Sequence, residues 1–186
     1  MLVSTRILMN ALQYYAGKGF APIDVPMIVD LDVSGYTKPK GVPDLYHGVV
    51  NGEHKCYQAS AEQSFIQLHK EGKLSDGKYM AVTPCYRHER YLDDTHYLMF
   101  MKLELIVVGV SMEDKEAVLH EVTEMCQDFF VSQGKECSTQ WNLYIDDSID
   151  IYSKDLGELG SYGYHEMMDG TGYVYGTGCA FPRVGV

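Results

Sequence analysis

Residues 83–104 read TPCYRHERYLDDTHYLMFMKLE, with an apolar run at each end and polar residues between. This pattern predicts two antiparallel strands joined by a long loop, because a simple hairpin would use a short turn. The loop is rich in basic and acidic side chains, namely Arg87, Glu89, Arg90, Asp93, Asp94 and His96. Charged residues gathered where two strands end predict a ligand-binding site.

Upstream of this stretch, residues 4–17 have a helical apolar period that ends at glycine. The run FAPIDVPMIV predicts a strand at a sheet edge or at an interface, since its prolines cannot donate to a ladder. We expect residues 31–45, rich in Asp, Gly, Pro and Lys, to form a long loop. Asn51-Gly52 between two alternating runs predicts a tight hairpin. Residues 59–72 predict a helix that Ser60 and Glu62 cap.

Downstream, residues 98–110 predict a strand, and residues 111–130 predict a helix capped by Ser111. Its apolar stripe, predicted to be core, consists of Val118, Val122, Met125 and Phe129. Two β-prone segments follow, at 140–144 and 149–152, and then a glycine-rich run from 157 to 186. Asp146, Asp147 and Asp150 lack the spacing of a calcium loop and predict a solvated turn.

Strands that follow one another without crossover helices predict an α+β fold, an antiparallel sheet flanked by helices. We expect residues 1–186 to be one domain. No GxGxxG or GxxxxGK sequence occurs, so a parallel nucleotide-binding fold is not indicated.

The formal net charge is −11, which disfavours nonspecific binding to nucleic acid or to an anionic membrane. No signal peptide or membrane-spanning run is evident, so we expect a cytoplasmic protein. The five cysteines form no CxxC pair and predict reduced, packed thiols rather than a disulfide framework or a zinc site.

Three segments resemble the three motifs of the class II aminoacyl-tRNA synthetase catalytic core, in the same order. Arg87-His88-Glu89, followed by His96 and Phe100, is similar to the second motif. Gly19-Phe20 through Pro26 resembles the first motif. Gly176-Thr-Gly178-Cys-Ala180-Phe-Pro182-Arg183 resembles the third, with Ala180 replacing a glycine and Pro182 replacing an acidic residue. The seryl-type branch and the amino acid:carrier-protein ligases are the most similar by eye.

This resemblance implies a homodimer built on residues 19–26 and ATP-dependent activation of a carboxylate to an acyl-adenylate. Arg87 and Arg183 would be catalytic, because guanidinium groups stabilise two anions that repel each other. The resemblance also implies that Glu89 and Phe100 bind adenine and that His96 and Arg183 hold the triphosphate. For each arginine, a surface ion pair is the simpler alternative.

The resemblance places the substrate at Ser60, Glu62 and Glu104, although Ser60 and Glu62 also suit a helix cap. Glu158 and Ser161 match a Mg²⁺-binding glutamate and its companion serine, and a sheet-surface carboxylate is the alternative. No segment is long enough for an anticodon-binding domain. We therefore expect a minimal ligase that activates a small amino acid or related carboxylate for tRNA, a carrier protein or another acceptor. The alternative is an inactive paralogue that acts as a dimeric binding or regulatory module.

Overall fold

The computed structural model describes residues 5–37, 46–89, 91–92, 96–142 and 147–184. This part of the chain contains four helices. They are α1 (Thr5–Gly17), α2 (Leu31–Thr37), α3 (Ala61–Lys70) and α4 (Lys115–Ser132).

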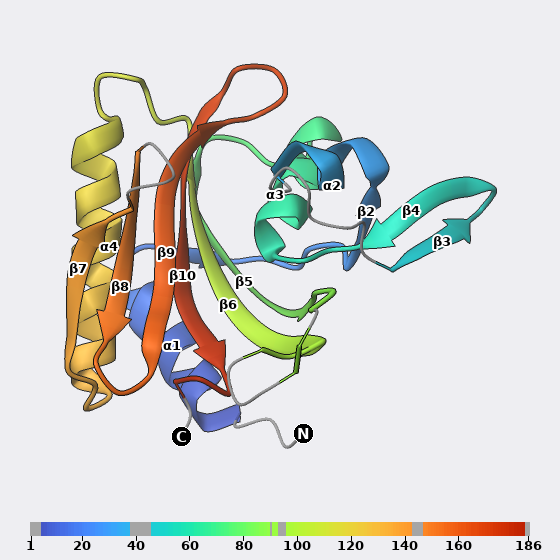
Figure 1. The fold of residues 1–186 in the computed structure, drawn as a ribbon. Helices are drawn as coiled ribbons and strands as arrows, with labels where there is room; N and C mark the ends of the chain where they lie inside the picture. Colours follow the sequence, from blue (N-terminus) through green and yellow to red (C-terminus); the bar gives the residue numbers. More distant parts are fainter. Residues whose placement is uncertain (1–4, 38–45, 90, 93–95, 143–146, 185–186) are drawn as a thin grey trace.

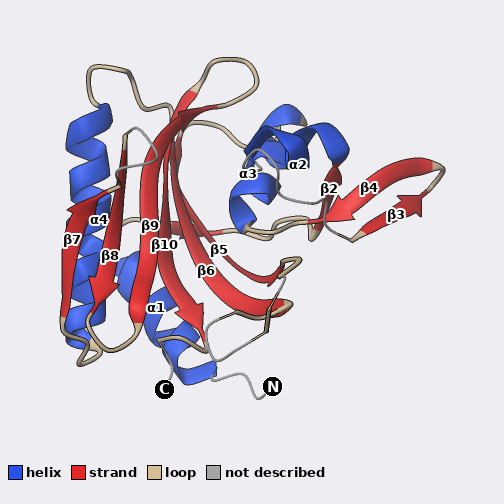
Figure 2. Ribbon diagram, in the orientation of Figure 1, coloured by secondary structure: helices blue, strands red, loops and turns tan. Residues whose placement is uncertain are grey.

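Two sheets complete the fold (Figures 1 and 2). The main sheet has seven strands in the order β1 (Ala21–Pro22), β5 (Gly77–Tyr86), β6 (Met99–Val108), β10 (Gly172–Phe181), β9 (Gly157–Glu166), β8 (Ser148–Ser153) and β7 (Cys137–Trp141). Only β1 runs parallel to its neighbour. The small sheet has the order β2 (Ile28–Asp30), β4 (Glu53–Tyr57) and β3 (His47–Val50). The predicted α+β fold with an antiparallel sheet is confirmed.

Alternate residues of β6 separate two hydrophobic clusters. Leu103, Leu105 and Val107 pack with α1 and α4, whereas Ile106 and Val108 pack with α3 and the α2 region. Because successive side chains of a strand point to opposite faces, the two groups of helices cover opposite faces of the main sheet. Figure 1 shows α4 on one side and α2, α3 and the small sheet on the other. We call the face that carries α3 the α3 face.

Glycines in β10 let aromatic side chains lie against the sheet on the opposite face. A Cβ atom at Gly176 would come 2.6 Å from Tyr162 Cδ1, and one at Gly178 would come 2.4 Å from Leu103 Cδ2. The Tyr162 hydroxyl donates to the carbonyl of Thr177, and that of Tyr15 donates to the carbonyl of Gly178, at 2.7 and 2.8 Å. The glycine-rich run is therefore a pair of long central strands.

Several local predictions are confirmed. The Asn51-Gly52 hairpin joins β3 to β4, with both residues at positive φ. Residues 83–104 contain the ends of β5 and β6, which pair along their whole length. The proline-containing run does supply an edge strand, β1, but its second part, β2, joins the small sheet.

Two predicted boundaries are wrong. Leu31–Thr37, expected to be loop, forms α2, in which Val33 and Ser34 are buried; residues 38–45 lie outside the described residues. Helix α4 begins at Lys115 with Asp114 as its N-cap, later than predicted. Ser111 instead forms a turn, in which its hydroxyl accepts from the Asp114 N–H.

The five cysteines are free thiols, and all but Cys137 are buried. None of the described helices is both long and apolar enough to cross a membrane.

Replacing Gly176 by alanine should destabilise the fold, because the new methyl group would collide with the buried ring of Tyr162. Overpacking of this kind costs about 1–3 kcal/mol. The matched control is Gly48→Ala, where a Cβ atom would meet nothing within 4 Å. Urea unfolding followed by circular dichroism would measure both variants. Equal unfolding free energies for the two variants would contradict the proposed role of Gly176 in packing.

Candidate functional site

One end of the main sheet gathers many of the residues that the sequence singled out. Strands β5, β8 and β10 end there, and β6 and β9 begin there, because these neighbours run antiparallel. Arg87 follows β5, Phe100 lies near the start of β6, Glu158 near the start of β9, and Arg183 just after β10. Residues up to 96 positions apart in the sequence, Arg87 and Arg183, thus lie at the same end of the main sheet.

Arg87 and Phe100 contact each other on the α3 face. The backbone N–H of Arg87 donates to the carbonyl of Leu98, which extends the β5–β6 pairing beyond the strand ends. The guanidinium carbon of Arg87 lies 5.1 Å from the centroid of the Phe100 ring. This is a cation–π contact. Glu89 is half-buried and His96 is exposed in the adjoining loop, whereas Arg90, Asp93 and Asp94 lie outside the described residues.

A β-bulge brings Glu158 and Ser161 to the same face although they are three residues apart. Glu158 lies opposite Tyr152, and Ser161 lies opposite Asp150, with a register shift between the two pairs. Because Asp150 and Tyr152 are two residues apart on β8, their side chains share a face, and so do those of their partners.

Asp150 was predicted to lie in a solvated turn, and that prediction is wrong. It lies within β8, is 4% exposed, and accepts from Asn142 Nδ2 at 2.8 Å. Its other oxygen, Oδ1, is buried without a hydrogen-bond partner among the described residues. Glu158, Ser161 and Asp150 share one face of β8 and β9, and oxygen atoms are the ligands that a hard cation such as Mg²⁺ prefers. Within the described residues, no three His, Cys, Asp or Glu side chains are placed together to hold a metal ion.

Arg183 lies close to the same bulge. Its Nη1 donates to the backbone carbonyl of Glu158 at 2.5 Å. Arg183 lies in the turn after β10, where the backbone N–H of Val184 donates to the carbonyl of Ala180. This turn therefore holds Arg183 beside the first residues of β9.

Further along the α3 face, Ser60 and Glu104 are in direct contact. The Ser60 hydroxyl lies 2.9 Å from both carboxylate oxygens of Glu104 and also accepts from the N–H of Glu62. Ser60 is the N-cap of α3, as predicted. Glu104 is 1% exposed and pairs with Lys102, whose Nζ lies 2.7 Å from Oε1. The hydrogen bond from Ser60 to this buried, ion-paired carboxylate thus anchors the start of α3 to β6.

Glu62 points to a different set of partners. Its Oε1 accepts from the Tyr173 hydroxyl at 2.8 Å and lies 3.3 Å from His165 Nδ1. The hydrogen bond to Glu62 raises the pKa of His165 above its ordinary value. Burial and Glu62 also raise the pKa of Tyr173, so its hydroxyl remains a donor. The His165 ring also packs against Tyr175.

The structure therefore adds Lys102, His165 and Tyr173 to the residues expected from the sequence. The sequence did hold a signal for Lys102, since a lysine and a glutamate two residues apart in an apolar strand must share one face. The contacts of His165 and Tyr173 with Glu62 span 103 and 111 residues, and no local pattern indicates them.

Proteins of known structure share this fold. The chain resembles a cytoplasmic serine-tRNA ligase from Naegleria fowleri in complex with AMP, with a TM-score of 0.79 and 19% identity over 98% of this chain and 48% of that chain. It also resembles a pyrrolysyl-tRNA synthetase from Desulfitobacterium hafniense in two structures. One has a TM-score of 0.70 and 17% identity over 97% of this chain and 66% of that chain, and the other has a TM-score of 0.71 and 18% identity over 97% of this chain and 67% of that chain. This chain thus spans about half to two thirds of their length.

Comparison with curated protein sequences gave no match. The family model described as the tRNA synthetases class II core domain (F) matches residues 58–162, more than half of the 186 residues. The matched segment runs from Gln58, the residue after β4, to Tyr162 in β9 and includes Ser60, Glu62, Arg87, Glu104 and Glu158. The chain belongs to the class II tRNA synthetase core family.

Proposed function

We propose that this protein binds ATP and activates a small amino acid, or a related carboxylate, as an acyl-adenylate. The observation that carries this proposal is the convergence of Arg87, Phe100, Glu158 and Arg183 at one end of the main sheet. The family membership and the AMP-bound serine-tRNA ligase of the same fold support it.

Arg87 would act at the α-phosphate, with Phe100 stacked on adenine and Glu89 accepting from its amino group. This role requires the Arg87 guanidinium to leave the Phe100 ring when the nucleotide binds. The cost is small, since an exposed cation–π contact contributes about 0.5–1 kcal/mol. A hydrogen bond to a charged group contributes about 1.5–3 kcal/mol, which favours the phosphate. Arg183 and His96 would hold the distal phosphates.

Glu158 and Ser161 would hold Mg²⁺, with Asp150 close by. A bound Mg²⁺ would supply positive charge at the phosphate oxygens. This proposal rests on the shared face of Glu158 and Ser161 and on the unpartnered oxygen of Asp150.

The substrate would lie along the α3 face, beyond the phosphates. Glu62 would accept from its α-ammonium group, and Ser60 and Glu104 would line the same pocket. The acceptor of the activated group would be a tRNA or a carrier protein. The net charge of −11 disfavours broad electrostatic binding to tRNA and so supports an acceptor other than tRNA.

Exchange of labelled pyrophosphate into ATP, measured across a panel of amino acids, tests the proposal. Arg87→Ala should lower exchange about 100- to 1,000-fold, the range for removal of a group that stabilises transition-state charge. Arg6→Ala is the matched control, since Arg6 is an exposed arginine on α1.

The alternative function, an inactive dimeric binding or regulatory module, predicts a different result. The wild-type chain would then give no exchange with any amino acid and no rise in melting temperature with ATP and Mg²⁺. That pair of results would refute the ligase proposal.

The pKa shift of His165 predicts how substrate binding depends on pH. Protonated His165 is stabilised by Glu62, so it competes with the substrate ammonium for this carboxylate. As pH falls through the raised pKa of His165, the KM for the amino acid should rise. The stability that this contact gives the unliganded fold has the opposite trend: it is fully present below about pH 6.5 and is lost as pH rises through the raised pKa.

Kinetics from about pH 6 to about pH 8.5 would test this around the ordinary histidine pKa of about 6.5. His165→Gln should flatten the change in KM, whereas His120→Gln, which alters a histidine that packs on Trp141, should not. An unchanged pH profile in His165→Gln would contradict the proposed competition.

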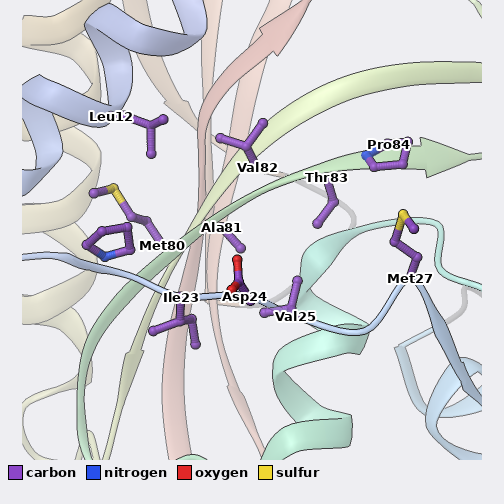
Figure 3. A pocket seen from close by; sticks show the side chains of 11 residues that line it. Leu12, Ile23, Asp24, Val25, Met27, Met80, Ala81, Val82, Thr83 and Pro84 are labelled. Atoms are coloured by element: carbon purple, nitrogen blue, oxygen red, sulfur yellow. The ribbon is translucent and has the colours of Figure 1, made fainter.

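We also propose that residues 19–26 contribute to a homodimer. A pocket of about 430 Å³ lies between this segment and β5, lined by Pro22, Ile23, Val25, Met27 and Thr83 among others (Figure 3). Asp24 is the charged residue in this otherwise uncharged lining. An apolar groove beside an edge strand suits association with a second copy.

Met27→Asp should shift the protein from dimer to monomer in size-exclusion chromatography with light scattering, because a charge would enter the contact surface. Met27 is 51% exposed and Met9 is 53% exposed, so Met9→Asp is a matched control outside the groove. A monomeric wild-type protein at micromolar concentration would refute the dimer proposal.

A further inference from the structure

Lys102 and Glu104 form a buried ion pair in the proposed substrate pocket. Lys102 is 8% exposed and Glu104 is 1% exposed, and their charged atoms lie 2.7 Å apart. A buried charge is tolerated when it is paired and hydrogen-bonded. Ser60 supplies the further hydrogen bond to Glu104.

The cross-strand neighbours of the pair are uncharged. Lys102 lies between Thr83 on β5 and Ala180 on β10. Glu104 lies between Ala81 and Thr177 on the same two strands. Within the described residues, Lys102 is thus the ion-pair partner of Glu104, and the two charges cancel.

Glu62 differs from Glu104 in the type of partner that it has. It lies in the first turn of α3, two residues after Ser60. Its Oε1 contacts the neutral hydroxyl of Tyr173 and the imidazole of His165. Imidazole can lose its proton near neutral pH, whereas the partner of Glu104 is the ammonium group of Lys102. Once His165 is neutral, the described contacts of Glu62 Oε1 are with uncharged groups, so this carboxylate can pair with a ligand cation.

We infer that Lys102 is a specificity-determining residue, which makes the pocket accept amino acids with uncharged side chains and reject those with a second ammonium group. The inference rests on the proposed adenylation activity. The α-ammonium of the substrate would pair with the carboxylate of Glu62. A second ammonium on the side chain would then meet Glu104 already neutralised by Lys102.

Pyrophosphate exchange with matched substrates tests this inference, using norleucine against lysine and norvaline against ornithine. Each pair differs mainly by a terminal methyl or ammonium group. The wild-type protein should prefer the neutral member of each pair. In Lys102→Met, the ratio of kcat/KM for the cationic member to that for the neutral member should rise at least about tenfold, since Glu104 becomes available to the second ammonium.

Two further variants separate charge from shape. Glu104→Gln leaves Lys102 with no carboxylate, so the same ratio should fall and the KM of the neutral amino acid should rise. The double variant Lys102→Met/Glu104→Gln again has no net charge at this position, and its ratio should stay within about threefold of wild type. If Lys102→Met does not fold, as judged by circular dichroism, the opposite behaviour of Glu104→Gln and the double variant still tests the inference.

Preference of the wild-type protein for lysine or ornithine would overturn the inference and leave the adenylation proposal intact. So would an unchanged ratio in folded Lys102→Met, or a ratio in the double variant that fell as far as that in Glu104→Gln. Absence of exchange with every amino acid, together with no stabilisation by ATP, would overturn both proposals.

Discussion

The antiparallel pairing of β6 with β5 on one side and β10 on the other decides which side chains can reach the candidate site. A shift of one residue in this register would turn Lys102 and Glu104 toward α1 and α4 and would turn Leu103 and Leu105 to the α3 face. The apolar contacts of these leucines oppose such a shift. The glycines of β10 add a second constraint, because Tyr15 and Tyr162 can donate to its carbonyl groups only when they lie close to that strand.

Local sequence patterns predicted the elements that depend on local interactions. The Asn51-Gly52 hairpin and the apolar stripe of α4 are examples, since turn geometry and helical period are encoded within a few residues. Helix α2 was missed because LDVSGYT carries Asp, Ser and Gly, which favour turns. Its formation depends on Val33, which is buried against the cluster of α3, and a contact between distant segments is absent from a local pattern.

The same distinction applies to the candidate site. Family resemblance pointed to Ser60, Glu62 and Glu104, and in the structure Ser60 contacts Glu104. It did not indicate that Glu62 lies beside His165 and Tyr173, because this depends on the pairing of β9 with β10 and on the packing of α3 against β5 and β6. The bulge in β9 is a further example: a strict alternation would have placed Glu158 and Ser161 on opposite faces.

The Lys102–Glu104 pair raises the question of why a sheet interior retains two charges. Stability alone is a weak reason, since apolar residues of similar volume often replace a buried ion pair with no loss, or with a gain of about 1–4 kcal/mol. Capping of α3 is also a weak reason, because Ser60 could cap that helix without a carboxylate partner. A ligand pocket, however, needs a defined charge as well as a defined shape. A carboxylate that accepts from Ser60 and is balanced by an adjacent ammonium provides a hydrogen-bond acceptor without excess negative charge. Control of pocket charge therefore explains this ion pair better than its contribution to folding does.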